Sequence, residues 1–195
     1  MKNQIILILG PKHSGKSQCA FALEKITGAE AADLDTIIEK QTGKTPRILY
    51  KEGPEIFRKT EVQALKFLIE NNPQTTDTPQ NQKLLIIAAG GGLVDNTEAL
   101  KLLSGRKDII TVYLDVSPET AWQRILNTAA GGELPPFLNT ENPRETHFAL
   151  HKRRAEAYKN IASLTISAEN KSPEEIAAEI WDITRQKFMT SIHPK

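Results

Sequence analysis

A cluster of glycine, lysine and serine near the N-terminus has the spacing of a phosphate-binding loop. Residues 10–17 read GPKHSGKS, which fits the pattern G-x-x-x-x-G-K-[ST]. In this pattern Gly10 and Gly15 let the backbone turn its N–H groups inward, and the next helix adds its positive end. Lys16 can reach the β- and γ-phosphates of a nucleotide, and Ser17 can ligate Mg²⁺. The spacing predicts a nucleotide-phosphate site; the alternative is an ordinary glycine-containing turn between a strand and a helix.

Two carboxylates follow within ADLDTIIE, at Asp33 and Asp35. Residues two apart in an extended backbone point to the same side, so both could face a metal–phosphate region. One could hold Mg²⁺ while the other accepts a proton from an attacking hydroxyl. Taken alone, this pattern before a helix is more often a helix cap with a solvated neighbour. The phosphate loop upstream favours the catalytic interpretation.

Arginines with a possible role toward an anionic substrate occur in two helical patterns. In EIFRKTE, Arg58 and Glu61 lie three residues apart, so Glu61 could orient the guanidinium group. An oriented arginine binds a carboxylate through two parallel hydrogen bonds, although a surface ion pair is the simpler alternative. The basic run at 152–154 is usually a solvated helix face, but one member could turn toward an anionic ligand.

Three consecutive glycines follow an apolar run in AAGGGL, at Gly90, Gly91 and Gly92. Without side chains between the backbone and a ligand, a substrate could approach this segment closely. A flexible turn is the alternative.

Strand and helix patterns alternate along the chain and must position these residues. Extended segments are predicted at 4–9, 29–35, 83–89, 108–116 and 163–167. Helices are predicted at 17–28, 36–43, 54–71, 117–126, 146–161 and 172–188. Residues 71–82 are polar and predict a surface loop, and residues 127–145 predict a mobile loop or lid outside the core. Alternating strands and helices predict an α/β fold with a parallel sheet and ligands at the carboxyl ends of its strands.

Bulk composition restricts the class of protein. The chain has 195 residues, with 25 lysines and arginines against 24 acidic residues, which suits one domain and argues against a nonspecific nucleic-acid binder. Its single cysteine, Cys19, permits no internal disulfide. No apolar run is long enough to span a membrane, and no signal-peptide pattern precedes the first strand. We therefore expect a cytoplasmic protein without nucleic-acid or membrane partners.

Taken together, these motifs resemble the shikimate kinases, within the nucleoside-monophosphate-kinase-like group of P-loop folds. The resemblance covers nearly the whole chain, and its specific segments are LILGPKHSGKS, DLDTIIE, EGPEIFRKTE, AAGGGLVDN, VYLDVSPETAWQRI and KRRAEAYKNIA. It implies a three-layer α/β sandwich with a five-stranded parallel sheet in the order 2-3-1-4-5. It also implies a single P-loop kinase domain over residues 1–195, with a substrate-binding helical region at about 34–71 and a lid at about 127–145.

The resemblance further implies ATP- and Mg²⁺-dependent phosphorylation of the 3-hydroxyl of shikimate, in aromatic amino-acid biosynthesis, by a monomer. The implied catalytic residues are Lys16 and Asp35, and the implied Mg²⁺ ligands are Ser17 and Asp33. The implied ATP-binding residues are Gly10, Ser14, Gly15, Lys16, Ser17, Gln18, Arg124 and Pro173. The implied shikimate-binding residues are Asp35, Arg58, Gly90, Gly91, Gly92 and Arg154.

The chain departs from the family pattern in the lid. The family usually has an arginine that opens an RPLL-like run, whereas the matching stretch here is LPPFL and Pro135 takes the place of the arginine. No lysine or arginine occurs from Asn127 to Pro143, so Arg144 or Lys152, the nearest cations along the chain, is expected to substitute, with Arg144 favoured. Without a substitute, the enzyme would be slow or would act on a different substrate. Two other functions stay open at this point: a kinase of another acid or polyol such as gluconate, and an ATP-binding regulatory module with impaired catalysis.

Overall fold

The computed structural model describes residues 4–71, 84–128 and 134–190 of the chain. Its strands are β1 (Gln4–Leu9), β2 (Glu30–Asp33), β3 (Leu84–Ala88), β4 (Ile109–Asp115) and β5 (Leu164–Ser167). Its α-helices are α1 (Lys16–Thr27), α2 (Leu34–Thr42), α3 (Pro46–Glu52), α4 (Pro54–Glu70), α5 (Thr97–Leu103), α6 (Pro118–Thr128), α7 (Pro143–Ile161) and α8 (Pro173–Thr190). Two 3₁₀ turns, η1 (Leu93–Asp95) and η2 (Pro136–Leu138), complete the described elements.

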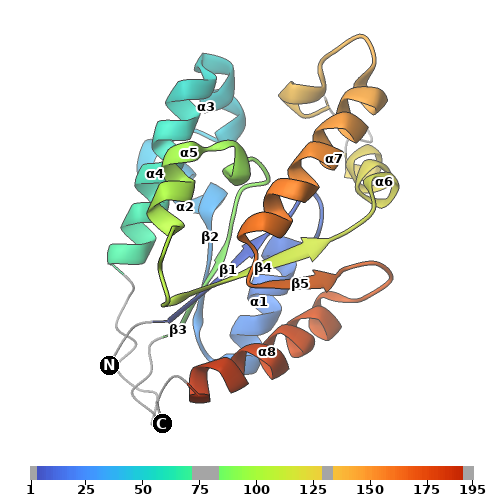
Figure 1. Ribbon diagram of the computed structural model, residues 1–195. Helices are drawn as coiled ribbons and strands as arrows, with labels where there is room; N and C mark the ends of the chain where they lie inside the picture. The colour runs from blue at the N-terminus through green and yellow to red at the C-terminus, as the bar shows by residue number, and fades with distance from the viewer. Residues whose placement is uncertain (1–3, 72–83, 129–133, 191–195) are drawn as a thin grey trace.

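The five strands form one parallel sheet in the order β2-β3-β1-β4-β5, which confirms the predicted fold class and strand order. Side chains alternate between the two faces of the central strand β1. Ile5, Leu7 and Leu9 pack with helices α2 to α5 and α7, whereas Ile6 and Ile8 pack with α1 and α8. Helices therefore cover both faces and give three layers (Figure 1).

Parallel strands place all their carboxyl ends at one edge of the sheet, where ligands bind in open α/β folds. β1 leads into the phosphate loop, β2 ends at Asp33, and β3 leads into the glycine segment after Ala88. Local signals end the intervening helices: Gly28 and Gly43 adopt left-handed conformations after α1 and α2. The candidate site residues thus converge because of the strand order.

The structure departs from the sequence-based elements in several places, including the start of α7 at Pro143, within the segment predicted to be a loop. Helices α3 and α5 were not expected, because each is a single short segment of seven residues without a long apolar stripe. Helix α2 begins at Leu34 rather than at residue 36. The prediction that 127–145 lies outside the core is wrong at Leu138, which is fully buried against Trp122 and Ile125.

Two predicted segments lie partly outside the described residues. These are most of the polar loop at 71–82 and residues 129–133 of the proposed lid. Over the ranges that the structure describes, no helix is long and apolar enough to cross a membrane.

Candidate active site

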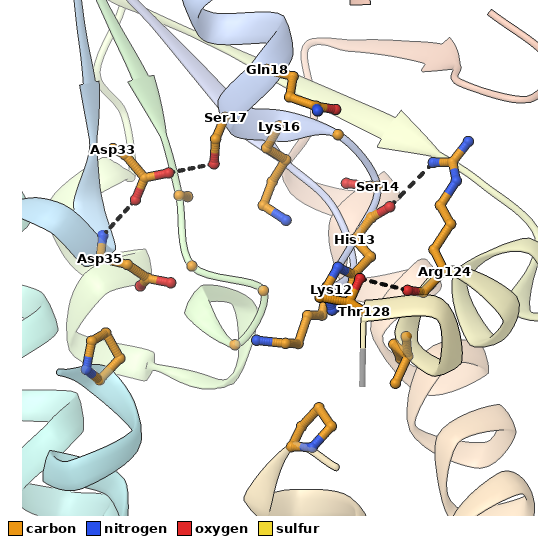
Figure 2. Close-up of a pocket in the computed structure, with 18 of the residues that line it drawn as sticks. Lys12, His13, Ser14, Lys16, Ser17, Gln18, Asp33, Asp35, Arg124 and Thr128 are labelled. Atoms are coloured by element: carbon orange, nitrogen blue, oxygen red, sulfur yellow. Dashed lines mark hydrogen bonds between the residues drawn. The ribbon is translucent and has the colours of Figure 1, made fainter. Parts of the chain in front are cut away.

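A cavity of about 1020 Å³ lies at the carboxyl edge of the sheet. The phosphate loop, Asp33 and Asp35, the glycine segment and residues of α3, α4, α6, α7 and α8 line it. Figure 2 shows the side chains of the phosphate loop facing Asp33 and Asp35 on one side and Arg124 on the other. Most of the candidate residues chosen from the sequence therefore share one cavity.

The phosphate loop has the backbone that its glycines permit. Gly10 has φ 149°, and a Cβ there would lie 2.8 Å from both the Leu114 carbonyl oxygen and Ser14 Oγ. Gly15 has φ 94° and forms the N-cap of α1, a conformation that side chains disfavour. Ser14 is buried, and its Oγ has no hydrogen-bond partner among the described residues. A concave loop with an unsatisfied hydroxyl at a helix N-terminus suits a phosphate ligand.

Lys16 lies at the base of this loop. Its side chain is buried, and Nζ donates a hydrogen bond to the Pro11 carbonyl oxygen at 2.7 Å. Burial lowers the pKa of Lys16 to about 8, while the charges of Asp35 and Asp33 offset part of this effect. The neighbouring carboxylates therefore favour the cationic form that phosphate binding requires.

Asp33 and Asp35 both line the cavity, but for a different reason from the one expected. The expectation of an extended backbone through Asp35 is wrong, because α2 begins at Leu34. Asp33 caps this helix: its Oδ1 accepts hydrogen bonds from the backbone N–H groups of Asp35 at 2.9 Å and Thr36 at 3.4 Å. Its other oxygen, Oδ2, accepts a short hydrogen bond from Ser17 Oγ. Asp33 thus caps α2 and also links this helix to Ser17, directly after the phosphate loop.

Asp35 is the second carboxylate and has a different environment. Burial raises the pKa of its carboxyl group, the negative charge of Asp33 adds to the rise, and Lys16 and Lys12 oppose it. A Cβ on Gly90 would lie 3.4 Å from Asp35 Oδ1, so the glycine leaves space beside this carboxylate. The Asp35 carboxylate is thus a better proton acceptor than an ordinary aspartate, and it is open to a small ligand.

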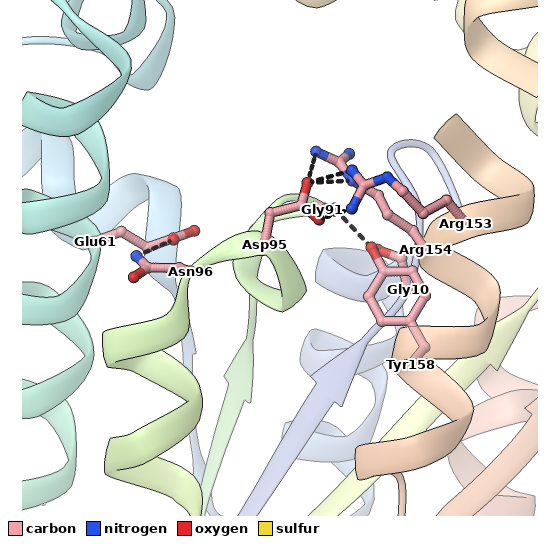
Figure 3. Close-up of polar contacts among 8 residues, drawn as sticks. All are labelled: Gly10, Glu61, Gly91, Asp95, Asn96, Arg153, Arg154 and Tyr158. Atoms are coloured by element: carbon pink, nitrogen blue, oxygen red, sulfur yellow. Dashed lines mark hydrogen bonds and ion pairs between the residues drawn. The ribbon is translucent and has the colours of Figure 1, made fainter. Parts of the chain in front are cut away.

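An ion cluster holds Arg154 at the cavity wall. Arg154 Nη2 lies 2.7 Å from Asp95 Oδ2, and Arg153 Nη1 lies 2.7 Å from Asp95 Oδ1 (Figure 3). Burial raises the pKa of the Asp95 carboxyl, but hydrogen bonds and charges from both arginines outweigh it and keep this pKa below its usual value. Arg154 lines the cavity, and a Cβ on Gly92 would lie 3.5 Å from its Nη2. One member of the basic run therefore does turn inward.

Tyr158 connects the phosphate loop to the glycine segment. Its hydroxyl donates to the Gly91 carbonyl oxygen at 2.6 Å and lies 3.0 Å from the Gly10 carbonyl oxygen (Figure 3). Its ring stacks on Tyr113, with centroids 5.0 Å apart. The sequence alone gave no sign of this connection, since the three residues it joins are far apart along the chain.

The expected pairing of Arg58 with Glu61 is wrong. Arg58 Nη1 instead pairs with Glu55 Oε1 in a largely exposed contact, and Arg58 is not among the residues that line the cavity. Glu61 is buried, and its Oε2 accepts a hydrogen bond from Asn96 Nδ2 at 2.9 Å. Burial raises the pKa of Glu61 to about 7, and the Asn96 hydrogen bond opposes this. Helix α4 turns these two side chains in different directions.

The opposite end of the cavity contains Arg124, Pro173 and Gln18, as expected for residues near a nucleotide. Arg124 Nη1 donates to the His13 carbonyl oxygen at 3.1 Å and thereby fixes α6 to the phosphate loop. His13 of the phosphate loop also lines the cavity, at φ 61°. Burial and the charges of Lys12, Lys16 and Arg124 lower the pKa of His13 to about 4, so its ring is neutral near pH 7.

Residues of the proposed lid that the structure describes lie across the cavity from the phosphate loop. Pro135, Pro136 and Phe137 line the cavity and bring no positive charge. Arg144, the expected substitute, pairs with Glu119 at 2.9 Å and does not line the cavity, so this expectation is not supported.

The sequence analysis missed three cations that line the cavity, which are Lys12, Arg47 and Lys171. Arg47 Nη2 donates to the Leu134 carbonyl oxygen at 2.9 Å, and Lys12 occupies a variable position of the phosphate-loop pattern. The loop pattern fixes only glycine, lysine and serine or threonine, so Lys12 carried no signal beyond its charge.

No group of three or more His, Cys, Asp or Glu side chains able to hold a metal ion occurs in the described ranges. The oxygen atoms of Ser17 and Asp33 are nevertheless adjacent at the edge of the phosphate loop. Hydroxyl and carboxylate oxygens are hard donors of the kind that Mg²⁺ prefers, and Mg²⁺ commonly uses few protein ligands beside substrate phosphates.

The comparisons with known proteins agree with this geometry. A family model described as shikimate kinase matches residues 12–185. A shikimate kinase of Marinomonas sp. is 30% identical over 188 residues, which are 96% of this chain and 95% of the relative. A shikimate kinase of Vibrio parahaemolyticus is 32% identical over 183 residues, which are 93% of this chain and 96% of the relative.

Solved structures give the same family. A shikimate kinase from Acinetobacter baumannii in complex with shikimate superposes with a TM-score of 0.78 at 28% identity, covering 95% of each chain. A shikimate kinase from Aquifex aeolicus superposes with a TM-score of 0.70 at 26% identity, covering 95% of this chain and 99% of the other.

Proposed function

This chain belongs to the shikimate kinase family, and we propose that it transfers the γ-phosphoryl group of ATP to the 3-hydroxyl of shikimate. The observation that carries the proposal is the single cavity lined by Lys16, Asp35 and Arg154. A phosphate-binding cation, a carboxylate of raised pKa and a carboxylate-binding arginine are the three groups that such a transfer needs.

ATP occupies the phosphate-loop side of the cavity in this proposal. Backbone N–H groups and Lys16 bind its β- and γ-phosphates, and Ser14 offers its free hydroxyl to a phosphate oxygen. Arg124, Pro173 and Gln18 lie on the side of the adenosine and α-phosphate. Both the loop backbone and the charges fit a triphosphate.

In this proposal the Ser17 hydroxyl and the Asp33 carboxylate, which are adjacent, would hold Mg²⁺. When bound, the metal neutralises charge on the β- and γ-phosphates. The hydrogen bonds of the helix cap fix Asp33 Oδ1, and this leaves Oδ2 directed toward Ser17.

Asp35 accepts the proton of the attacking hydroxyl. The raised pKa of its carboxyl makes the carboxylate a stronger proton acceptor than an aspartate of ordinary pKa. The backbone of Gly90 lies beside Asp35 without a side chain, which leaves room for the acceptor hydroxyl. Catalysis otherwise depends on positioning and charge neutralisation.

Arg154 binds the carboxylate of shikimate from the cavity wall, where Asp95 holds its guanidinium in place. Arg58 joins it after leaving Glu55; surface ion pairs of this kind contribute at most about 1 kcal/mol, so the release costs little. Its neighbour Phe57 lines the cavity, which puts this part of α4 beside the substrate.

Helices α2 to α4, at residues 34–70, form the substrate side, and the residues near Pro135 cover the cavity. A single kinase domain, a monomeric state and a cytoplasmic location stay predictions from the sequence.

Release of ADP from ATP and Mg²⁺, measured with shikimate, with gluconate and with neither, tests the function. We expect release that depends on shikimate and a product phosphorylated at the 3-hydroxyl. Release that depends on gluconate alone would instead identify a kinase of another acid. ATP binding without release in any mixture would identify a regulatory module.

A further inference from the structure

Cationic side chains that line the cavity differ in whether other protein groups already bind them. Within the described residues they are Lys12, Lys16, Arg47, Arg124, Arg154 and Lys171. The acceptors bound by five of them are the carbonyl oxygens of Pro11 (Lys16), Leu134 (Arg47) and His13 (Arg124) and the carboxylates of Asp95 (Arg154) and Glu179 (Lys171). Lys12 alone has no hydrogen bond or ion pair in the part of the chain that the structure describes. Its ammonium group is therefore available to a ligand.

The backbone places Lys12 between the nucleotide side and the acceptor side of the cavity. A Cβ on Gly91 would lie 3.0 Å from the Lys12 backbone nitrogen, so the phosphate loop and the glycine segment touch here. Tyr158 holds the same two segments together through its hydroxyl. A phosphoryl group that moves from a nucleotide to an acceptor must pass this junction.

The side chain of Lys12 is exposed and extends into the cavity toward the side on which Asp35 lies (Figure 2). Lys16 and Asp35 line the same cavity. Lys12 thus shares this cavity with the phosphate-binding lysine and with the proposed proton acceptor.

We propose that Lys12 is a second catalytic cation, which contacts the phosphoryl group during its transfer. This inference rests on the proposed function for the identity of the acceptor. In the transfer, the acceptor oxygen bonds to the γ-phosphorus, and the bond from that phosphorus to the bridging oxygen breaks with its electron pair left on ADP. The hydroxyl proton goes to Asp35. Lys12 keeps its own proton and stabilises the negative charge on the transferring oxygens.

The sequence of the proposed lid explains why the reaction needs a cation from the phosphate loop. Residues 127–143 contain no lysine or arginine, and Arg144 is paired with Glu119 away from the cavity. Pro135 and Phe137 line the cavity without contributing charge. Lys12 of the phosphate loop supplies the positive charge that residues 127–143 lack.

The test compares Lys12→Met, which keeps the length of the side chain without its charge, with Lys12→Arg and the control Lys66→Met. Lys66 is an exposed residue of α4 that pairs with Glu70 at 3.8 Å, so this control removes one charge outside the cavity. Calorimetric titration with ADP and with a non-hydrolysable ATP analogue, both with Mg²⁺, measures binding. Steady-state kinetics with shikimate measures kcat and KM.

For Lys12→Met we expect the affinity for the ATP analogue to fall about tenfold with that for ADP nearly unchanged, and kcat to fall about tenfold or more. Lys12→Arg should recover most of both losses, and Lys66→Met should resemble the native chain. Equal weakening of ADP and the analogue, or an unchanged kcat, would overturn the proposal. A raised KM for shikimate with kcat preserved would place Lys12 on the substrate carboxylate and would also overturn it. If the native chain does not act on shikimate, the proposed function fails, and the two titrations still decide whether Lys12 binds the γ-phosphate.

Discussion

Asp33 and Asp35 show how two identical side chains, two residues apart, acquire different tasks. The oxygens of Asp33 accept hydrogen bonds from backbone N–H groups and from Ser17, which keeps this carboxylate fixed beside the phosphate loop. Asp35 is in the first turn of α2, where burial raises the pKa of its carboxyl. The chemical difference comes from the start of the helix at Leu34, which separates the two environments.

For Asp35→Asn we expect kcat to fall by about 100-fold or more, because the amide cannot accept the hydroxyl proton. ATP affinity should change little, since Lys16 and the loop backbone bind the phosphates. Steady-state kinetics and a nucleotide titration measure the two effects. Asp182→Asn is the matched control on the surface, where Asp182 pairs with Arg185 at 2.8 Å. A variant at position 35 with near-native kcat would remove Asp35 from the proposed role.

At the scale of elements, the loops after β1 and β3 support each other. The contact between Gly91 and the Lys12 backbone leaves no room for a side chain, and Tyr158 of α7 bonds to the carbonyl groups of both loops. Helix α7 also brings Arg154 to the cavity wall. The geometry of the site therefore depends on packing among three elements rather than on any one loop.

Gly91→Ala tests this dependence. The added Cβ would lie 3.0 Å from a backbone nitrogen, which cannot rotate away as a side chain can, so the two loops must shift apart. We expect kcat/KM to fall about tenfold, because small displacements of reacting groups are costly in catalysis. Gly53→Ala is the control, since the nearest atom there is the flexible end of Ile56 at 3.4 Å. Native kinetics in Gly91→Ala would show that the geometry of the site does not depend on the contact between the two loops.

At the scale of the whole molecule, Glu61 and Asn96 join two helices of the same layer beneath the site. Asn96 caps α5 and donates to the Glu61 carboxylate and also to the Arg58 carbonyl oxygen, both at 2.9 Å. Glu61 Oε1 has no hydrogen-bond partner among the described residues. A buried carboxyl group with one unsatisfied oxygen makes the stability of the fold depend on pH.

The direction of this dependence follows from the pKa of Glu61, which folding raises from 4.5 to about 7. The folded chain binds a proton that the unfolded chain has lost, so the stabilisation is complete below pH 4.5 and is lost as the pH rises through about 7. The loss amounts to at most about 3 kcal/mol.

Glu61 should therefore make the free energy of unfolding fall between pH 5 and pH 8, whereas the lowered pKa of His13 makes it rise up to about pH 6.5. The free energy of unfolding of the native chain minus that of Glu61→Gln should fall over this range, as urea denaturation at a series of pH values would show. Glu98→Gln is the control, because Glu98 is an exposed residue paired with Lys101 at 2.8 Å. An unchanged slope in Glu61→Gln would mean that Glu61 is ionised in the folded state throughout this range.

The sequence by itself determined the phosphate loop and the five extended segments. These features are local, because glycine spacing, apolar runs and helix-ending glycines act within a few residues of one another. The start of α1 is the clearest case, since Gly15 caps the helix and Lys16 and Ser17 open it directly after the phosphate loop. The strand order is not local, and it was implied only by the resemblance to a known family.

Only the tertiary structure decided the contacts between distant residues. Glu61 is oriented by Asn96, which is 35 positions away, rather than by Arg58 on its own helix. Arg144 is bound by Glu119 of α6, outside the cavity. Lys12 faces the acceptor side because its backbone packs against Gly91, in the loop after β3. Helical periodicity allows several partners for a charged side chain, and long-range packing selects one of them, so these partners could not be predicted from spacing alone.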